Sequence, residues 1–222
     1  MKLVCYDIDY VFDTEMAGVN CLIIENQKLM YSLLMDIQGQ MNGFNGRSVL
    51  SEKDKELPMA KNLELLTHFV PFDINQKSLL NKTASVLESI AVSDEYYEET
   101  MELLSKIEEY MLRLSFHMDS DLICDGTTIN SLVKASGIRF KDEYDSLAEK
   151  LIDYMELVTS LDRRKLFITV NLRSFIDDDE AQRFVDTLIS HQFHVVMIES
   201  NEHPLLDHEQ RYIVDYNLCE IM

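Results

Sequence analysis

The chain has 222 residues, with 20 lysines and arginines against 40 aspartates and glutamates, and its formal net charge is therefore −20. A hydrophobic fraction of 46% is enough for a buried core, which excludes a disordered acidic tail. The sequence contains no apolar run of about 18 residues, and Asp7 interrupts the N-terminus too early for a secretory signal peptide. We therefore predict a cytoplasmic protein without a membrane segment. The charge also disfavours nucleic acid, because binding to phosphates normally requires a basic surface.

The first part of the chain is predicted to alternate between strands and a helix. Apolar runs predict strands over residues 2–12, 18–24 and 63–66. Helical spacing begins at Glu25 and closes at Gly39. Two Asn-Gly pairs within residues 40–55 predict turns and a loop.

The middle of the chain has the periodicity of two long helices, over residues 75–92 and 93–117. Ser93 is a suitable N-cap for the second helix. This helix carries one apolar stripe, which consists of Leu103, Leu104, Ile107, Tyr110, Met111 and Leu114. A stripe of this length is expected to pack against the neighbouring helix.

The C-terminal part returns to an α/β pattern. Helices are predicted over residues 128–136, 143–161 and 178–190, and buried strands over 166–171 and 194–200. A strand, a helix and a second strand in this order predict a parallel pair with a right-handed crossover. The segments RYIVDY and LCEIM are expected to add an edge. We therefore predict an α/β head formed by residues 1–69 and 139–222, interrupted by an α-helical leg over residues 70–138.

A nucleotide hydrolase would need a phosphate-binding loop, and the sequence has none. Neither GxxxxGK[ST] nor GxGxxG occurs. The six glycines, at positions 18, 39, 43, 46, 126 and 137, are too far apart to form one. This excludes a P-loop ATPase that binds nucleotide in the usual way.

The segment Tyr6–Val11 matches the hhhDxDxV opening of haloacid-dehalogenase-like phosphatases. In that alternative Asp7 is the nucleophile and Asp9 the general acid, beside a magnesium ion. Thr169 and the acidic run 177–179 could serve as later motifs, but the short distance between them leaves no room for the required lysine motif. A purely protein-binding scaffold is a further alternative.

Three carboxylates, Asp119, Asp121 and Asp125, lie within seven residues of each other. They do not form an EF-hand, because Asn130 occupies the position of the twelfth-residue glutamate. Hard oxygen ligands of this kind suit calcium, and a solvated acidic loop is the alternative.

Basic residues cluster at 163–165, around Gly137 and near the start of the long helices. Each cluster by itself is typical of an ordinary solubilising surface. Any DNA bound here would be held through its backbone, without sequence readout.

Taken together, the motifs resemble the Csn2 family of CRISPR-associated proteins, which act in spacer acquisition in subtype II-A systems. The resemblance rests on the order and spacing of several segments, which are Asp121–Gly126, Leu132–Ile138, Asp145–Lys150, the basic triplet 163–165 before LFITVN, HVVMIES and RYIVDYN. It implies a P-loop-ATPase-like α/β head that lacks a Walker A loop, with an inserted α-helical leg. It also implies a homotetrameric ring that holds Ca²⁺ and admits double-stranded DNA ends, has no catalytic activity, and assists the CRISPR integrase and the effector nuclease.

The resemblance also implies sites. The metal ligands are expected to be Asp119, Asp121, Asp125, Asp145 and Glu149, while Cys124 departs from a position that is often glutamate. Lys134 and the triplet Arg163, Arg164 and Lys165 match basic positions of the family. With the other clustered cations, the candidate DNA contacts are Lys77, Lys82, Lys134, Arg139, Arg163, Arg164 and Lys165. Because salt screens charges separated by more than about 10 Å, a basic lining can coexist with an acidic chain. Binding is then expected to be modest and sensitive to salt.

Overall fold

The computed structural model describes residues 1–119, 122–123, 125–162 and 165–221. The chain divides into two compact units. Unit 1 comprises residues 1–72 and 144–222, and unit 2 comprises residues 73–143. The predicted boundaries were 69/70 and 138/139, so unit 2 begins and ends a few residues later than the leg predicted from the sequence.

The main sheet of unit 1 has six strands in the order β10-β9-β3-β8-β7-β6. Their bounds are β3 Val19–Ile24, β6 Leu63–Leu66, β7 Leu166–Val170, β8 His194–Glu199, β9 Glu209–Val214 and β10 Glu220–Ile221. All neighbours pair in parallel except β10, which runs antiparallel to β9. The five parallel strands, numbered in chain order, follow the order 5-1-4-3-2, which is that of P-loop-ATPase-like cores.

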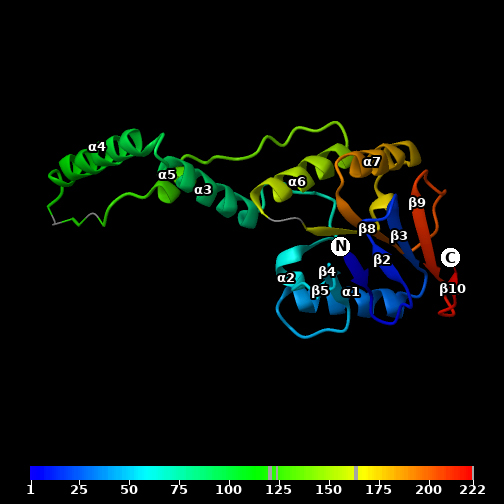
Figure 1. The fold of residues 1–222 in the computed structure, drawn as a ribbon. Coiled ribbons are helices and arrows are strands. Elements are labelled where there is room, and N and C mark those ends of the chain that lie inside the picture. The colour runs from blue at the N-terminus through cyan, green and yellow to red at the C-terminus, as the bar shows by residue number, and fades with distance from the viewer. Residues whose placement is uncertain (120–121, 124, 163–164, 222) are drawn as a thin grey trace. The chain divides into compact units, whose positions relative to one another are not determined.

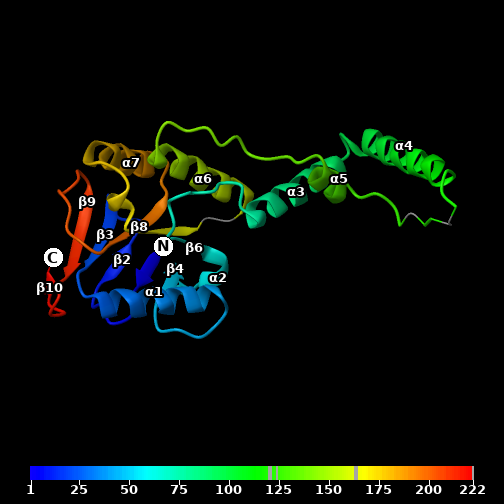
Figure 2. The same ribbon diagram turned by 180° about the vertical axis from the view of Figure 1, so that it is seen from behind.

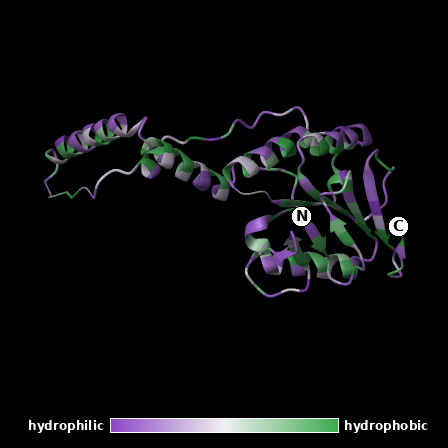
Figure 3. Ribbon diagram, in the orientation of Figure 1, coloured by the Kyte–Doolittle hydropathy of each residue, from purple (hydrophilic) through white to green (hydrophobic). Residues whose placement is uncertain are grey.

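The strands β3, β7 and β8 are buried along their whole length, which is typical of parallel strands covered on both faces. The parallel pair predicted for the C-terminal strand–helix–strand unit is confirmed by the pairing of β7 with β8. Figure 3 shows these strands in mostly hydrophobic colours. The predicted α/β fold class is confirmed.

Helices cover both faces of this sheet. In Figures 1 and 2, α6 (Leu147–Leu161) and α7 (Asp178–Ser190) lie on one face, and α1 (Gln27–Met41) lies on the other. Two short helical segments, α2 (Met59–Asn62) and η1 (Leu172–Ser174), complete unit 1. On the side of α1, the apolar face of this helix packs in one core with alternate residues of β7 and β8, such as Ile168 and Ile198. This alternation is what a sheet between two layers requires.

A second, antiparallel sheet in unit 1 was only partly predicted. Its strands are β1 (Lys2–Val4), β2 (Val11–Asp13), β4 (Val49–Glu52) and β5 (Lys55–Glu56), in the order β2-β1-β4-β5. The single strand predicted over residues 2–12 was wrong, because the chain turns at Asp7, which has a φ of 56°. The turn and loop predicted over residues 40–55 are confirmed for residues 42–48, but β4 and the first residue of β5 occupy part of the rest.

Unit 2 consists of α3 (Lys77–Ala91), α4 (Tyr97–Ser115) and α5 (Ile129–Ala135), and α3 packs with α5. The expectation that the stripe of α4 is buried against its neighbour was wrong. Thr100 is the one buried residue of α4, and the side chains of the stripe that remain most exposed are Leu103 (49%), Tyr110 (52%), Met111 (49%) and Leu114 (44%). We call these four residues the apolar stripe. Within the described residues, no helix is both long enough and apolar enough to cross a membrane.

Candidate nucleic-acid interface

The connection between β3 and α1 is where a phosphate loop would lie in a P-loop-ATPase-like core. Here it consists of Glu25 and Asn26 alone. The side-chain oxygen of Asn26 accepts hydrogen bonds of 3.1 Å from the backbone N–H groups of Lys28 and Leu29. These are the groups at a helix N-terminus that would otherwise hold an anion.

The turn between β9 and β10 is hydrogen-bonded to the same connection. Asn26 Nδ2 donates a hydrogen bond of 2.9 Å to the carbonyl of Tyr216. In return, the backbone N–H of Tyr216 donates to Glu25 Oε2 at 3.3 Å. The carboxylate of Glu25 repels phosphate, and the amides at the start of α1 are already bonded to Asn26, so this connection differs from a phosphate loop.

The pair predicted for the phosphatase alternative, Asp7 and Asp9, lies in the turn between β1 and β2. Both residues are exposed, and both flanking strands belong to the antiparallel sheet. In open α/β sheets, ligands bind at the carboxyl ends of the parallel strands. The geometry therefore does not support the phosphatase alternative.

Unit 2 contains a pocket of about 430 Å³ between α3, α5 and the segment that follows α5. Three of the predicted DNA contacts line it: Lys77 from the start of α3, Lys134 from the last turn of α5, and Arg139. All three side chains are exposed. We call this hollow with its three cations the basic pocket.

The basic pocket has no counter-charge of its own. Its lining includes no aspartate or glutamate. Within the part of the chain that the structure describes, none of Lys77, Lys134 and Arg139 forms an ion pair. Unpaired cations are unexpected in a chain with twice as many acidic as basic residues. Cations that have no acidic partner in the lining are suited to an anionic ligand.

A pair of hydrogen bonds holds the two sides of the pocket together. Phe140 N–H donates to Asn75 Oδ1 at 2.8 Å, and Asn75 Nδ2 donates to the Phe140 carbonyl at 3.1 Å. This contact places Arg139 beside the beginning of α3. Gly137, with a φ of 68°, makes the left-handed turn that ends α5, as its position in the sequence predicted.

The beginning of α3 adds to the positive potential. Its N-cap residue, Gln76, makes no side-chain cap, and the first turn contains no acidic residue. The first backbone N–H groups of a helix have no partner within the helix and carry a partial positive charge. They lie at the same end of α3 as Lys77.

The other predicted DNA contacts lie elsewhere. Lys82 is half-buried on α3 and does not line the pocket. The ammonium of Lys165 is buried in unit 1, where Nζ lies 3.4 Å from Glu64 Oε2 and 3.5 Å from Asp162 Oδ2. Its charge is paired there with two carboxylates, so Lys165 is not available to DNA. Arg163 and Arg164 lie outside the described residues.

The predicted calcium ligands are divided between the units. Asp119 and Asp125 are exposed residues of unit 2, and Asp121 lies outside the described residues. Asp145 and Glu149 belong to unit 1, at the N-terminus of α6, where Asp145 N–H donates to Glu149 Oε2 at 3.4 Å. Calcium takes six to eight oxygen ligands, so this pair has suitable chemistry but cannot complete a site. No three His, Cys, Asp or Glu side chains of the described residues are grouped to hold a metal ion.

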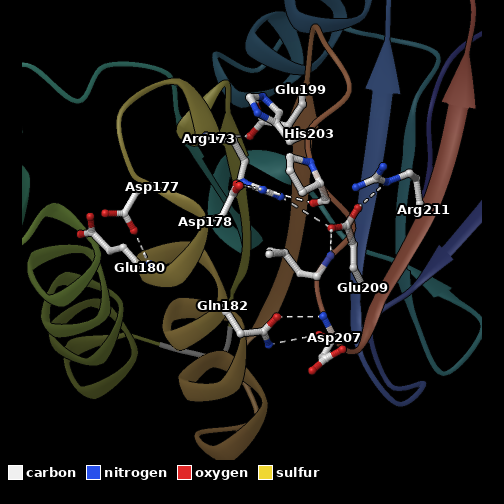
Figure 4. A network of polar contacts seen from close by, with 12 residues as sticks. Arg173, Asp177, Asp178, Glu180, Gln182, Glu199, His203, Asp207, Glu209 and Arg211 are labelled. Carbon is white, nitrogen blue, oxygen red and sulfur yellow. Dashed lines mark hydrogen bonds and ion pairs between the residues drawn. The ribbon is translucent and has the colours of Figure 1, made fainter.

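A buried polar network in unit 1 was not predicted from the sequence (Figure 4). Arg173 of η1 is 5% exposed, and its guanidinium lies 2.6 Å from Asp178 Oδ1 and 3.7 Å from Glu209 Oε2. Glu209 also lies 2.7 Å from Arg211 Nε. The sequence did contain a signal for this network, because a charged residue stands at the end of each of two buried-strand patterns. These residues are Arg173 in LFITVNLR and Glu199 in HVVMIES.

Glu199 is a second buried acid of this network, and its side chain is 1% exposed like that of Glu209. Its Oε1 accepts a hydrogen bond from the backbone N–H of Arg173, while Oε2 has no hydrogen-bond partner among the described residues. His203 Nε2 lies 3.8 Å from Oε2. Burial raises the pKa of Glu199 to about 7 and lowers the pKa of His203. The network therefore ties η1 to the loop after β8 and carries a carboxyl group that titrates near neutrality.

A family model described as "CRISPR-associated protein (Cas_Csn2)" matches residues 40–218, which is most of the chain. The chain belongs to the Csn2 family. A curated relative, "CRISPR-associated protein Csn2" of Enterococcus faecalis, is 23% identical over 205 residues, covering 87% of this chain and 91% of the relative. A protein of the same name from Streptococcus agalactiae is 24% identical over 207 residues, covering 90% and 89%.

Among solved structures, a putative ABC transporter ATP-binding protein from Pyrococcus furiosus covers 95% of this chain and 97% of its own, with 10% identity and a TM-score of 0.40. The family resemblance seen in the order of the motifs is confirmed by the Csn2 match. The matched range includes the basic pocket, the Asp145–Glu149 pair and the buried network of Glu199.

Proposed function

We propose that this protein binds the ends of double-stranded DNA as a calcium-stabilised homotetrameric ring and assists spacer acquisition during CRISPR adaptation. Membership of the CRISPR-associated Csn2 family supports the biological setting. The observation that carries DNA binding is the basic pocket, where Lys77, Lys134 and Arg139 have no described ion-pair partner in a chain of net charge −20.

Binding of this kind is directed at phosphates. The pocket supplies two ammonium groups and one guanidinium, which contact phosphate oxygens well and do not by themselves read a base sequence. Each neutralised phosphate releases counterions, so affinity falls as salt rises. With few cations per chain, one copy binds DNA weakly.

Assembly offsets this weakness. A homotetramer carries four basic pockets, and once one is engaged the others act at a high effective concentration. The apolar stripe of α4 supports self-association, because it is a row of large side chains that a single chain leaves exposed. Buried apolar surface contributes about 25 cal/mol per Å², which favours covering the stripe with a second copy.

In this proposal the ligands of calcium are five carboxylates, which are those of Asp119, Asp121, Asp125, Asp145 and Glu149. Their carboxylates are the hard oxygen donors that calcium prefers. An ion held by these carboxylates would stabilise the native chain, because the unfolded chain cannot assemble the same ligands. In this proposal, the bound ion supplies local positive charge and no chemical step.

The ring would act without catalysis. It would hold captured ends for the CRISPR integrase and the effector nuclease, which carry out the covalent chemistry. The capped β3–α1 connection supports a role that does not depend on nucleotide hydrolysis, since its amides are already bonded to Asn26.

The test is a competition between DNA topologies. Labelled linear duplex is bound to the full chain with calcium present, and unlabelled linear duplex or covalently closed circles are added as competitors. We expect linear duplex of any sequence to compete and closed circles to compete weakly. The variant Lys77→Gln/Lys134→Gln should lose most of the affinity, while Lys28→Gln, which removes an exposed lysine of α1, should not.

Two results would overturn this function. Closed circles that compete as well as linear duplex would contradict binding at ends. A chain that forms oligomers but shifts no DNA would be a protein-binding scaffold, and light scattering on the same samples separates that case from a monomer.

A further inference from the structure

The shape of the basic pocket restricts which phosphate can enter it. A volume of about 430 Å³ holds a phosphate with part of one nucleotide, not a duplex. An internal phosphodiester is joined to a nucleotide on each side, and duplex DNA carries these groups on its convex outer surface. A phosphate at a strand end has a neighbour on one side only, so it can enter a pocket without bending the chain on both sides.

The charges favour the same group. A terminal phosphate monoester carries about −1.5 to −2 charges at pH 7, whereas a phosphodiester carries one. Three cations from two segments of chain, Lys77, Lys134 and Arg139, line the pocket, and its lining has no acidic side chain. The guanidinium of Arg139 can donate two parallel hydrogen bonds to one phosphate. The three positive charges are therefore matched better by a terminal phosphate monoester than by an internal phosphodiester.

The apolar residues of the lining strengthen this match. Leu80, Ala84, Val133 and Ile138 line the pocket together with the cations. An apolar wall lowers the effective dielectric constant beside a charge, so each attraction is stronger than on an open surface. The Asn75–Phe140 hydrogen bonds fix the two sides of the pocket, which reduces the ordering needed on binding.

We infer that the basic pocket of unit 2 binds the terminal phosphate monoester of a DNA strand, so that the protein distinguishes phosphorylated ends from hydroxyl ends. The inference rests on the proposed function and adds the chemical identity of the end that is captured. A 5′-phosphate and a 3′-phosphate share this chemistry, and the experiment below separates them.

The experiment compares one short linear duplex in three forms: with 5′-phosphates, with 3′-phosphates, and with hydroxyl groups at every end. The affinity of the full chain for each is measured by fluorescence anisotropy at fixed salt and calcium. We expect at least one phosphorylated form to bind about tenfold more tightly than the hydroxyl form, since a few exposed charge pairs together give a factor of this size. Inorganic phosphate added as a competitor should remove that advantage.

Matched variants assign the preference to the pocket. Lys134→Gln and Arg139→Gln should reduce the preference to near unity while binding to the hydroxyl form changes less. Lys28→Gln should keep the full preference. Thermal unfolding of each variant shows whether it is folded.

Equal affinity for all three forms would overturn the inference and leave the proposed function standing. A preference that survives in both pocket variants would also overturn it. Failure to bind any form of the duplex would overturn the proposed function together with the inference.

Discussion

The backbone N–H of Arg173 donates a hydrogen bond of 3.1 Å to Glu199 Oε1, which joins two residues 26 positions apart at the ends of neighbouring strands. The bond places a carboxyl group that is 1% exposed against the first turn after β7. Its second oxygen remains without a hydrogen bond among the described residues. An acid in this position is stable when protonated and costly when charged.

The first prediction concerns pH. Because the pKa of Glu199 is raised to about 7, above the 4.5 of an exposed glutamate, the folded chain holds this proton more tightly than the unfolded chain. The contribution of Glu199 to stability is therefore complete below pH 4.5 and lost as pH rises toward 7. Glu199→Gln keeps the acceptor for Arg173 and removes the titration. The variant should be more stable than the parent by about 3 kcal/mol at pH 8, and similar to it near pH 4.5.

Denaturant unfolding over this pH range measures the effect. The exposed residue Glu202 offers a control, since Glu202→Gln should leave the pH profile as it is. Parallel profiles for Glu199→Gln and the parent chain would contradict the prediction.

The second prediction concerns Arg173. Its guanidinium lies against Asp178 and Glu209, and the side chain of Glu209 is 1% exposed. Arg173→Ala leaves that carboxylate with one fewer cation, and breaking a buried pair in this way costs about 3–5 kcal/mol. The free energy of unfolding, measured with denaturant, should fall accordingly. Arg183→Ala, at an exposed position of α7, is the matched control and should change stability by less than about 0.5 kcal/mol.

The third prediction concerns the apolar stripe. Leu103→Glu/Met111→Glu places two carboxylates on the stripe without disturbing a core, because both positions are about half exposed. We expect the mass in light scattering to fall from the assembly to a smaller species, while the helical circular dichroism signal stays the same. Ser105→Glu, on an exposed position away from the stripe, should keep the assembly. An unchanged mass for the double variant would exclude the stripe as a contact between copies.

The fourth prediction concerns calcium. Excess chelator should lower the Tm of the parent chain, since an ion present at a hundred times its Kd contributes about 2.7 kcal/mol to stability. Asp145→Asn/Glu149→Gln should abolish the response to chelator. Asp54→Asn, at an exposed turn with a φ of 60° that asparagine tolerates, should respond as the parent does. If the parent chain melts at the same temperature with and without chelator, it has no structural calcium site.

Much of the fold could be predicted because its signals are local. The buried strands β3, β7 and β8 are continuous apolar runs, and α7 spans the residues that its periodicity indicated. The break at Asp7 could not be predicted, because its left-handed turn uses an ordinary residue in place of glycine. The strands β4 and β5 are too short to have a periodicity of their own.

The rest depends on partners that are distant in sequence. Lys165 belongs to a basic triplet, but its ammonium group donates a hydrogen bond to Glu64, which is 101 residues away in the sequence. Lys77 and Arg139 were predicted from separate clusters, and only the Asn75–Phe140 contact shows that they line one pocket. The stripe of α4 has the periodicity of a buried face. Periodicity does not show whether the surface that packs against such a face belongs to the same chain or to another one.

The position of β3 in the main sheet has a consequence for synthesis. Both strands that flank it, β8 and β9, come from residues 194–214, near the C-terminus, so the sheet stays open while most of the chain is translated. Residues 73–143 have left the ribosome by then, and two of their helices, α3 and α5, pack with each other. The unit that carries the basic pocket can therefore fold before the sheet on either side of it in the sequence is complete. During that interval β3 offers two unpaired, apolar edges, which is where a chaperone is most needed.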